Sequence, residues 1–144
     1  MSKRIVIVGA SSGLGKEIAL IFLEKSWKVG IASRNIEDLK EIEKLYPQSA
    51  VSQQIDINNE DAIINLENLI NELGGIDVYF HSSGIGSQNT LIDINTEIST
   101  CKTNVLGFTR MVDYMYNYFK TNNIMGQICV ISSIAGTKGL GVSP

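Results

Sequence analysis

Short apolar runs alternate with amphipathic segments along the whole chain. The apolar runs are rich in branched residues and end at Gly or polar positions, which predicts strands at 4–9, 28–33, 50–56, 76–84 and 127–133. The segments between them repeat apolar residues every three or four positions, which predicts helices at 15–26, 36–46, 59–73 and about 95–120. Strands that alternate with helices form a parallel sheet, and runs such as "IVIV" and "ICVI" suit strands covered on both faces. The pattern predicts an α/β fold with a doubly wound, five-stranded parallel sheet, in one domain over residues 1–144.

The last predicted helix is the longest, and its apolar residues fall on two faces. A core stripe at helical spacing is expected from Ile98, Cys101, Val105, Phe108, Val112, Met115 and Phe119. A second face carries Met111, Tyr114 and Tyr118, and we expect it to be exposed.

Composition and charge narrow the class of protein. Hydrophobic residues make up 44% and charged residues 19%, an ordinary globular mixture, and a net charge of −3 gives no attraction to nucleic acid or to an anionic membrane. The apolar run Ile5 to Val8 is too short for the core of a signal peptide, and no stretch could span a bilayer, so we expect a cytoplasmic protein. Cys101 and Cys129 lack metal or redox spacing. We expect two buried thiols and no metal site.

The turn after the first predicted strand carries a chemical signal. The stretch "VGASSGLGKEIA" places Gly9, Gly13 and Gly15 between a strand and a helix, in a G-x-x-x-G-x-G spacing. Such a turn lets the first amides of the helix face a pyrophosphate, to which Ser11 and Ser12 can also donate. Side chains at Gly13 or Gly15 are expected to obstruct that approach. A Gly/Ser turn that starts a helix without binding a ligand is the alternative.

Five segments in order resemble the short-chain dehydrogenase/reductase family, from Lys3 to Pro144. They are "GASSGLG" at 9–15, "DI" at 56–57, "HSSG" at 81–84, "TNVLG" at 103–107 and "ISSIAG" at 131–136. The resemblance implies a Rossmann-type fold. It also implies hydride transfer between a nicotinamide coenzyme and a small-molecule carbonyl or alcohol substrate.

The resemblance assigns the coenzyme contacts. It implies that the glycine turn, Leu14 included, holds the phosphates and that Asp56 and Ile57 contact the adenine. It implies that the backbone at Ser83 and Gly84 passes the ribose and the nicotinamide.

The stretch "HSSG" departs from the N-N-A-G that the family usually has at 81–84. His81, the only histidine, stands in the place of the first Asn. We expect a hydrogen-bonded residue at a strand end beside the coenzyme rather than a catalytic group. Ser82 replaces the second Asn, which removes the usual side-chain tie between neighbouring strands.

The end of the second strand indicates which coenzyme is bound. NAD-binding units of this type place an acidic residue there for the ribose 2′-hydroxyl, but this chain has Ser33 and Arg34. A guanidinium forms charge-assisted bonds with a 2′-phosphate, so NADP(H) is favoured over NAD(H). The alternative is that Arg34 is a solvated residue neutralised by Glu37 or Asp38.

By resemblance, Ser133 holds the substrate oxygen and Asn104 organises a proton relay. The family's general acid or base is the Tyr of a Tyr-x-x-x-Lys about a dozen positions after the Ser, which would fall just past Pro144. We therefore expect the 144-residue chain to be inactive. The formal match Tyr116 and Lys120 precedes Ser133 and lies about 18 Å along the helix from Asn104, so we expect it near the opposite edge of the sheet, in a packing role.

The resemblance also bears on assembly. In the family the long helix commonly forms a dimer surface, and the last predicted strand would be an open apolar edge, so we expect a homo-oligomer. Three functions stay open: the N-terminal portion of an NADP-dependent oxidoreductase, a non-catalytic dinucleotide-binding module, or a dimerisation fragment that binds nothing.

Overall fold

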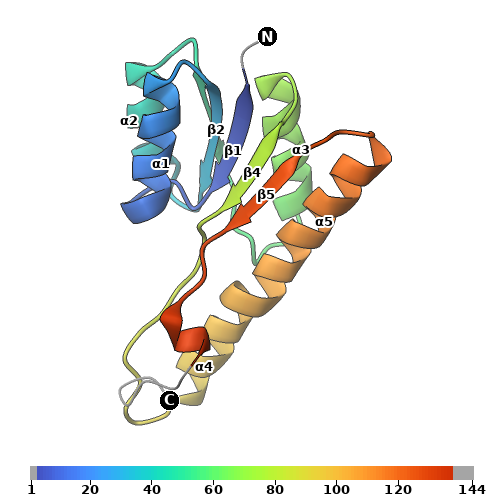
Figure 1. Cartoon of the computed structure of the whole chain (residues 1–144). Helices are drawn as coiled ribbons and strands as arrows, with labels where there is room; N and C mark the ends of the chain where they lie inside the picture. Colours follow the sequence, from blue (N-terminus) through green and yellow to red (C-terminus); the bar gives the residue numbers. More distant parts are fainter. Residues whose placement is uncertain (1–2, 138–144) are drawn as a thin grey trace.

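The computed structural model describes residues 3–137 (Figure 1). Its strands are β1 (Arg4–Val8), β2 (Lys28–Ser33), β3 (Ala50–Gln54), β4 (Val78–His81) and β5 (Gln127–Val130). Its α-helices are α1 (Gly13–Glu24), α2 (Ile36–Leu45), α3 (Ala62–Leu73), α4 (Ile94–Cys101) and α5 (Phe108–Thr121). A π-helix, η1 (Lys102–Gly107), joins α4 to α5, and a 3₁₀ turn, η2 (Ile134–Gly136), follows β5. Within residues 3–137, no helix is both long and apolar enough to cross a bilayer.

The strands form one parallel sheet in the order β3-β2-β1-β4-β5. Val8 of β1 is paired with Ala32 of β2 on one side and with His81 of β4 on the other. The chain builds outward from β1 to β3 and then returns past β1 to build β4 and β5, so the strand order reverses between β1 and β4. The predicted doubly wound sheet is confirmed. Ligands bind at such a switch point in open α/β sheets.

Helices cover both faces of the sheet (Figure 1). On one face, α1 and α2 bury a core that includes Ile5, Ile31 and Leu39. On the other face, α3 and α5 bury a second core that includes Val6 and Leu66. Ile5 and Val6 belong to opposite cores because successive side chains of a strand point to opposite faces. This explains why the first strand has no polar position between Ile5 and Val8.

Several elements are shorter than the sequence pattern predicts. The pattern predicts strands over 76–84 and 127–133, but pairing stops at His81 and at Val130, where the chain leaves the sheet for the carboxyl edge. The helix predicted from 59 begins at Ala62, since the Asn59 N–H donates to the Asp56 carbonyl (3.0 Å) in a turn. The apolar periodicity identifies each element but not the residue at which its hydrogen bonds end.

The long helix is continuous through α4, η1 and α5, but its buried face differs from the prediction. Met111, expected to be exposed, is fully buried, as is Met115, and Phe119 is buried as well. Ile98 and Val105, expected in the core, are 47% and 55% exposed. Figure 1 shows the reason, since α4 projects beyond the strands of the sheet. The π-helical turn also changes the number of residues per turn, so one stripe does not continue across it.

The burial of four more side chains differs from the prediction. Cys101 is exposed on the projecting part of the helix and Cys129 is only partly buried on β5, so the prediction of two buried thiols is wrong. Tyr114 and Tyr118 are not fully exposed but pack against the core under α3 and α5. The Tyr114 hydroxyl donates to Glu67 Oε1 (2.7 Å), which links these two helices.

Strand β5 forms one edge of the sheet that residues 3–137 build. Its last residue, Val130, is 45% exposed, and the following Ile131 is 40% exposed. An apolar edge with unpaired backbone groups favours pairing with another chain. The expectation of an open apolar edge is therefore confirmed for the described residues.

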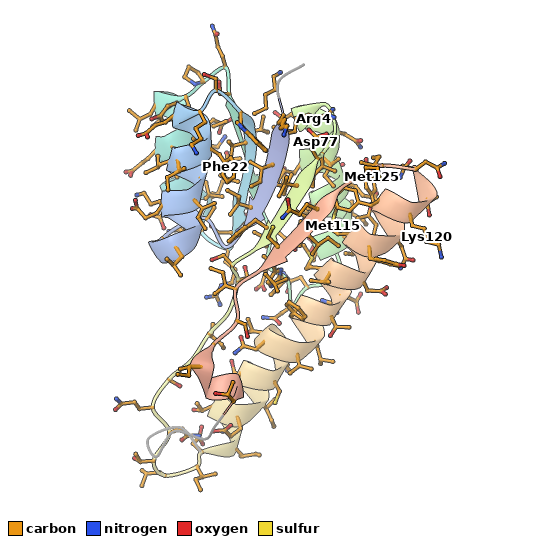
Figure 2. All side chains as sticks on the ribbon, in the orientation of Figure 1. Arg4, Phe22, Asp77, Met115, Lys120 and Met125 are labelled. Carbon is orange, nitrogen blue, oxygen red and sulfur yellow. The ribbon has the colours of Figure 1, made fainter. Side chains whose placement is uncertain are left out.

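Arg4 and Asp77 form an ion pair at the amino ends of β1 and β4 (Figure 2). The backbone N–H and Nε of Arg4 donate to Asp77 Oδ2 at 2.8 and 3.2 Å, and Nη2 donates to Oδ1 at 3.1 Å. These hydrogen bonds hold the pKa of the Asp77 carboxyl below its ordinary value. Both side chains are about a third exposed, so the pair contributes only about 0.5–1 kcal/mol to the free energy of unfolding.

Candidate functional site

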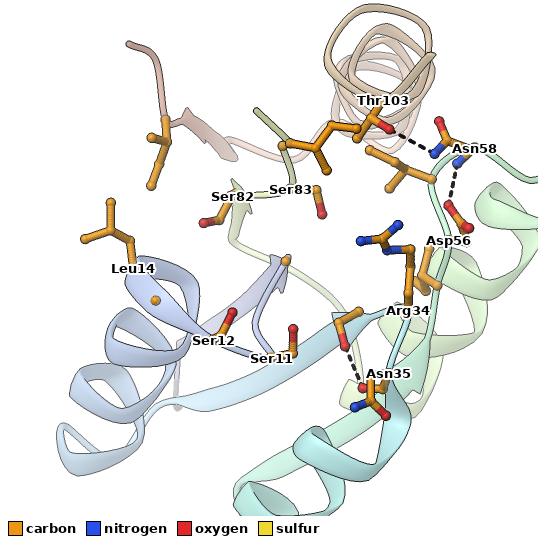
Figure 3. A pocket seen from close by; sticks show the side chains of 18 residues that line it. Ser11, Ser12, Leu14, Arg34, Asn35, Asp56, Asn58, Ser82, Ser83 and Thr103 are labelled. Atoms are coloured by element: carbon orange, nitrogen blue, oxygen red, sulfur yellow. Dashed lines mark hydrogen bonds between the residues drawn. The ribbon is translucent and has the colours of Figure 1, made fainter. Parts of the chain in front are cut away.

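A cleft of about 810 Å³ lies at the carboxyl ends of the strands (Figure 3). Its walls come from the turn after β1, the end of β2 and the loops after β3 and β4, with single residues from η1 and from the segment after β5. All of the predicted coenzyme residues except Gly15 line it. The lining residues are Gly9, Ser11, Ser12, Gly13, Leu14, Ser33, Arg34, Asn35, Ile55, Asp56, Ile57, Asn58, Ser82, Ser83, Gly84, Ile85, Thr103 and Ile131.

The first turn of α1 opens onto this cleft. Ser12, which precedes the helix, has an extended backbone (φ −157°), and its side chain makes no capping hydrogen bond. The first N–H groups of a helix have no partner within the helix, and they carry partial positive charge. No acidic residue stands in the first turn. This end of α1 is therefore suited to an anion such as a phosphate.

Two glycines shape the turn before α1. Gly9 has a φ of +95°, and an added Cβ would lie 2.6 Å from the Ser83 nitrogen and 2.7 Å from the Ser82 carbonyl carbon. Glycine is required here because the chain after β4 passes against it at the switch point. Gly13 has a φ of +54° and nothing within 4 Å of an added Cβ. Its missing side chain leaves room at the start of the helix.

Gly15 has a different role from the one expected. It is buried and does not line the cleft. An added Cβ would overlap the Gly9 carbonyl oxygen and lie 2.9 Å from its carbonyl carbon and 3.2 Å from Ser82 Cβ. A side chain at Gly15 would therefore obstruct the packing of α1 against the turn, not the approach of a ligand.

Arg34 extends from the end of β2 into the cleft, between the Asp56 side and the Ser83 side (Figure 3). Its carbonyl accepts a hydrogen bond from Gln54 Nε2 (2.8 Å), which fixes its backbone to β3. Asp38, a candidate neutralising group, instead accepts from Asn35 Nδ2 (2.8 Å). Among residues 3–137, no carboxylate lies within ion-pair distance of Arg34. Its exposed guanidinium can therefore receive an anion.

The loop after β3 forms the wall beside Arg34. Ile57 is buried, and Asp56 is partly exposed at the cleft. Asp56 Oδ1 accepts from the Asn58 N–H (3.0 Å), which fixes the orientation of its carboxylate. A hydrogen-bond acceptor beside an apolar side chain suits the edge and face of a nucleobase.

Asn104 lies in η1 but does not line the cleft. Its Oδ1 accepts from the Ile85 N–H (2.9 Å), and its Nδ2 donates to the Ile85 carbonyl (2.7 Å). An added Cβ on Gly84 would lie 3.5 Å from Asn104 Oδ1. The Asn104 side chain therefore holds the loop after β4 against the long helix.

His81 is a buried residue at the end of β4, as expected, but it does not line the cleft. Its Nδ1 lies 2.9 Å from the Tyr79 hydroxyl, its ring meets Phe108 edge-on, and its Nε2 has no hydrogen-bond partner among the described residues. Burial lowers the pKa of His81 to about 4, so the imidazole is neutral at pH 7. A buried neutral ring outside the cleft has a structural role.

The family model for short chain dehydrogenases matches residues 3–144. The chain belongs to this family. It is 33% identical to the NADP-dependent 3-hydroxy acid dehydrogenase of Schizosaccharomyces pombe and 29% identical to carbonyl reductase family member 4 of Xenopus laevis. These alignments cover 93% and 96% of this chain but only 55% and 59% of the two relatives. The chain therefore spans little more than half the length of the curated relatives it matches.

Solved structures of other proteins share the fold. The structure of ElxO with NADP bound superimposes with a TM-score of 0.87 at 29% identity, covering 99% of this chain and 60% of ElxO. Serine dehydrogenase from Escherichia coli gives a TM-score of 0.86 at 24% identity, covering 96% of this chain and 65% of that structure. The sheet and its helices are thus those of a short chain dehydrogenase.

The other predicted catalytic residue of this short chain dehydrogenase, Ser133, does not line the cleft. Ser133 is exposed, and its carbonyl accepts from the Gly136 N–H (3.0 Å) in the η2 turn. Ile131, two residues before it, does line the cleft. Lys120 lies at the far end of α5, near Met125, so the prediction that the Tyr116–Lys120 pair falls near the opposite edge is confirmed (Figure 2). The expected packing role is wrong, since Tyr116 is 59% exposed.

Sequence reasoning missed some of the cleft wall of this family member. Those residues are Asn35, Ile55, Asn58, Ser82, Ile85, Thr103 and Ile131. All but Ile131 adjoin a predicted site residue, so a wider window around each of those residues would have found them. Thr103 adjoins Asn104 in the long helix, and Ile131 lies two residues before Ser133.

Proposed function

We propose that this chain binds NADP(H) in the cleft as part of a short-chain oxidoreductase that transfers hydride between the nicotinamide and a carbonyl or alcohol. The observation that carries the proposal is Arg34, which projects into the cleft without a carboxylate partner among the described residues. A guanidinium at the end of β2 matches a 2′-phosphate in charge and geometry. An NAD-binding unit would use a carboxylate in that place.

The rest of the cleft supplies the other contacts in this proposal. The first amides of α1, with Ser11 and Ser12, receive the pyrophosphate. Asp56 and Ile57 face the adenine. The stretch from Ser83 to Gly84 runs beside the nicotinamide ribose. The bound coenzyme supplies the chemistry by accepting or giving up a hydride.

In the same proposal Ser133 binds the substrate oxygen, and Asn104 positions the loop beside the nicotinamide. Saturable binding without hydride transfer would also fit a non-catalytic dinucleotide-binding module, which is the second candidate. Hydride transfer to any of a panel of ketones would exclude that module.

Two further observations support the proposal. The relative from Schizosaccharomyces pombe is named NADP-dependent, and ElxO is seen with NADP bound. We also propose a homo-oligomer, because β5 is an edge strand of the sheet that residues 3–137 build, and its exposed apolar end can pair with a second chain.

Titration of the purified chain with NADPH and with NADH, followed by calorimetry, tests the coenzyme assignment. We expect tighter binding of NADPH, and we expect Arg34→Leu to weaken it by roughly 10- to 100-fold, since a charged hydrogen bond is worth about 1.5–3 kcal/mol. Affinity for NADH should change little. Lys44→Met removes a positive charge from the last turn of α2, away from the cleft, and should alter neither affinity. A folded Arg34→Leu chain that binds NADPH as tightly as the wild type would overturn the proposal.

A further inference from the structure

The adenine-side wall of the cleft rests on the long helix. Gly107, the last residue of η1, is buried against Ile57, and an added Cβ would lie 2.7 Å from Ile57 Cγ1 and 3.2 Å from the Ile57 carbonyl oxygen. The φ of Gly107 is −62°, which is ordinary for a helix. Glycine is therefore required here by the close approach of Ile57 and not by an unusual backbone conformation. The loop after β3 therefore lies directly on the backbone of the helix.

Arg110, one turn further along, holds the same loop by its carbonyl groups. Its Nη1 donates to the Ile57 carbonyl (2.7 Å) and to the Asn59 carbonyl (3.0 Å). Asn58, between these two residues, donates from Nδ2 to Thr103 Oγ1 (3.1 Å), and Thr103 is only 6% exposed. Three consecutive loop residues are thus bonded to one face of η1 and α5.

This loop also presents Asp56 to the cleft. The Asp56 carboxylate is oriented by the Asn58 N–H, and the Asp56 carbonyl accepts from the Asn59 N–H, both at 3.0 Å. Arg110 reaches the residues on either side of Asn58, so it fixes the turn that sets the direction of Asp56. Arg110 itself does not line the cleft.

We infer that Arg110 is a positioning residue for the adenosine half of the coenzyme, acting through the loop at 56–59. The inference rests on the proposed function for its ligand. Its physical basis is that a cation bonded to two carbonyls confines the loop to one arrangement before the ligand arrives, so less ordering accompanies binding. Because η1 also carries Asn104, which holds Ile85, the long helix braces both sides of the cleft.

The test uses 2′,5′-ADP, the adenosine half of NADP, as the calorimetric probe. We expect Arg110→Met to weaken its binding by roughly fivefold or more and Arg110→Lys, which keeps one charged donor, to restore part of the loss. Lys120→Met removes a positive charge from the far end of the same helix and should leave the affinity unchanged. Amide hydrogen exchange should accelerate at 55–60 in Arg110→Met, while the strands keep their protection.

The outcomes distinguish failure of the proposed function from failure of the inference alone. If the wild-type chain does not bind 2′,5′-ADP, the proposed function fails, and the inference fails with it. If the wild type binds and Arg110→Met is within twofold of it, only the inference fails. Exchange that accelerates throughout the chain would show general destabilisation and would also overturn it. Should Arg110→Met not fold, Arg110→Lys decides, because an affinity equal to that of the wild type would contradict a positioning role.

Discussion

Gly15→Ala tests the role of the glycine turn most directly, because two physical effects oppose each other there. Gly15 lies inside α1, where replacement of Gly by Ala ordinarily stabilises a helix by about 1 kcal/mol. In this structure, however, an added Cβ would overlap the Gly9 carbonyl oxygen and lie 2.9 Å from the Gly9 carbonyl carbon. The sign of the change in stability therefore shows which effect is larger.

The steric effect should win. The carbonyl of Gly9 belongs to a backbone turn whose N–H donates to Ala32 (2.8 Å), so it cannot rotate away as a side chain could. Relief requires α1 to move outward from a core in which Ala19 and Leu23 are packed. Overpacking of this kind costs about 1–3 kcal/mol or more, which exceeds the gain in helix propensity. We expect the free energy of unfolding to fall by about 1–2 kcal/mol.

Urea unfolding followed by circular dichroism measures this change, and Gly86→Ala is the matched control. Gly86 has no positive φ, and nothing lies within 4 Å of an added Cβ, so its substitution should leave the unfolding midpoint nearly unchanged. Gly15→Ala should also weaken NADPH binding, because the displaced helix carries the turn that lines the cleft. A Gly15→Ala chain at least as stable as the wild type would refute the packing explanation.

Two further predictions concern acid stability and assembly. Burial lowers the pKa of His81 to about 4 in the folded chain, compared with about 6.5 in the unfolded chain. Between these two pH values the unfolded chain binds a proton at His81 and the folded chain does not, so the free energy of unfolding falls as the pH falls. Between pH 7 and pH 5 the wild type should lose about 2 kcal/mol more than His81→Asn in urea unfolding, and equal losses would contradict this. Light scattering should find self-association that Val130→Lys reduces, since a charge on an edge strand opposes pairing; a heat-stable wild-type monomer would argue against it.

Local pattern was enough for the order of the elements and for much of the cleft. Branched apolar runs such as Ile5 to Val8 have the period of strands, and parallel strands bring their carboxyl ends to one edge of the sheet. This is why Gly9 and Arg34, far apart in the chain, could be assigned to one site from the strand ends, whereas Asp56 was assigned to it by the family resemblance. The residues of a turn and the charges at a strand end belong to short stretches of sequence, so they can be identified without the tertiary structure.

Tertiary structure decided which groups are buried and what each contact does. Met111 is in the core and Ile98 is not, because α4 extends past the sheet while α5 lies on it. Gly15 meets the carbonyl of Gly9, and Arg110 meets the loop after β3, through packing that brings separate elements together. Periodicity reports that a helix has an apolar side, but burial depends on what the neighbouring layer covers. That layer is set by distant parts of the chain, so no local pattern contains it.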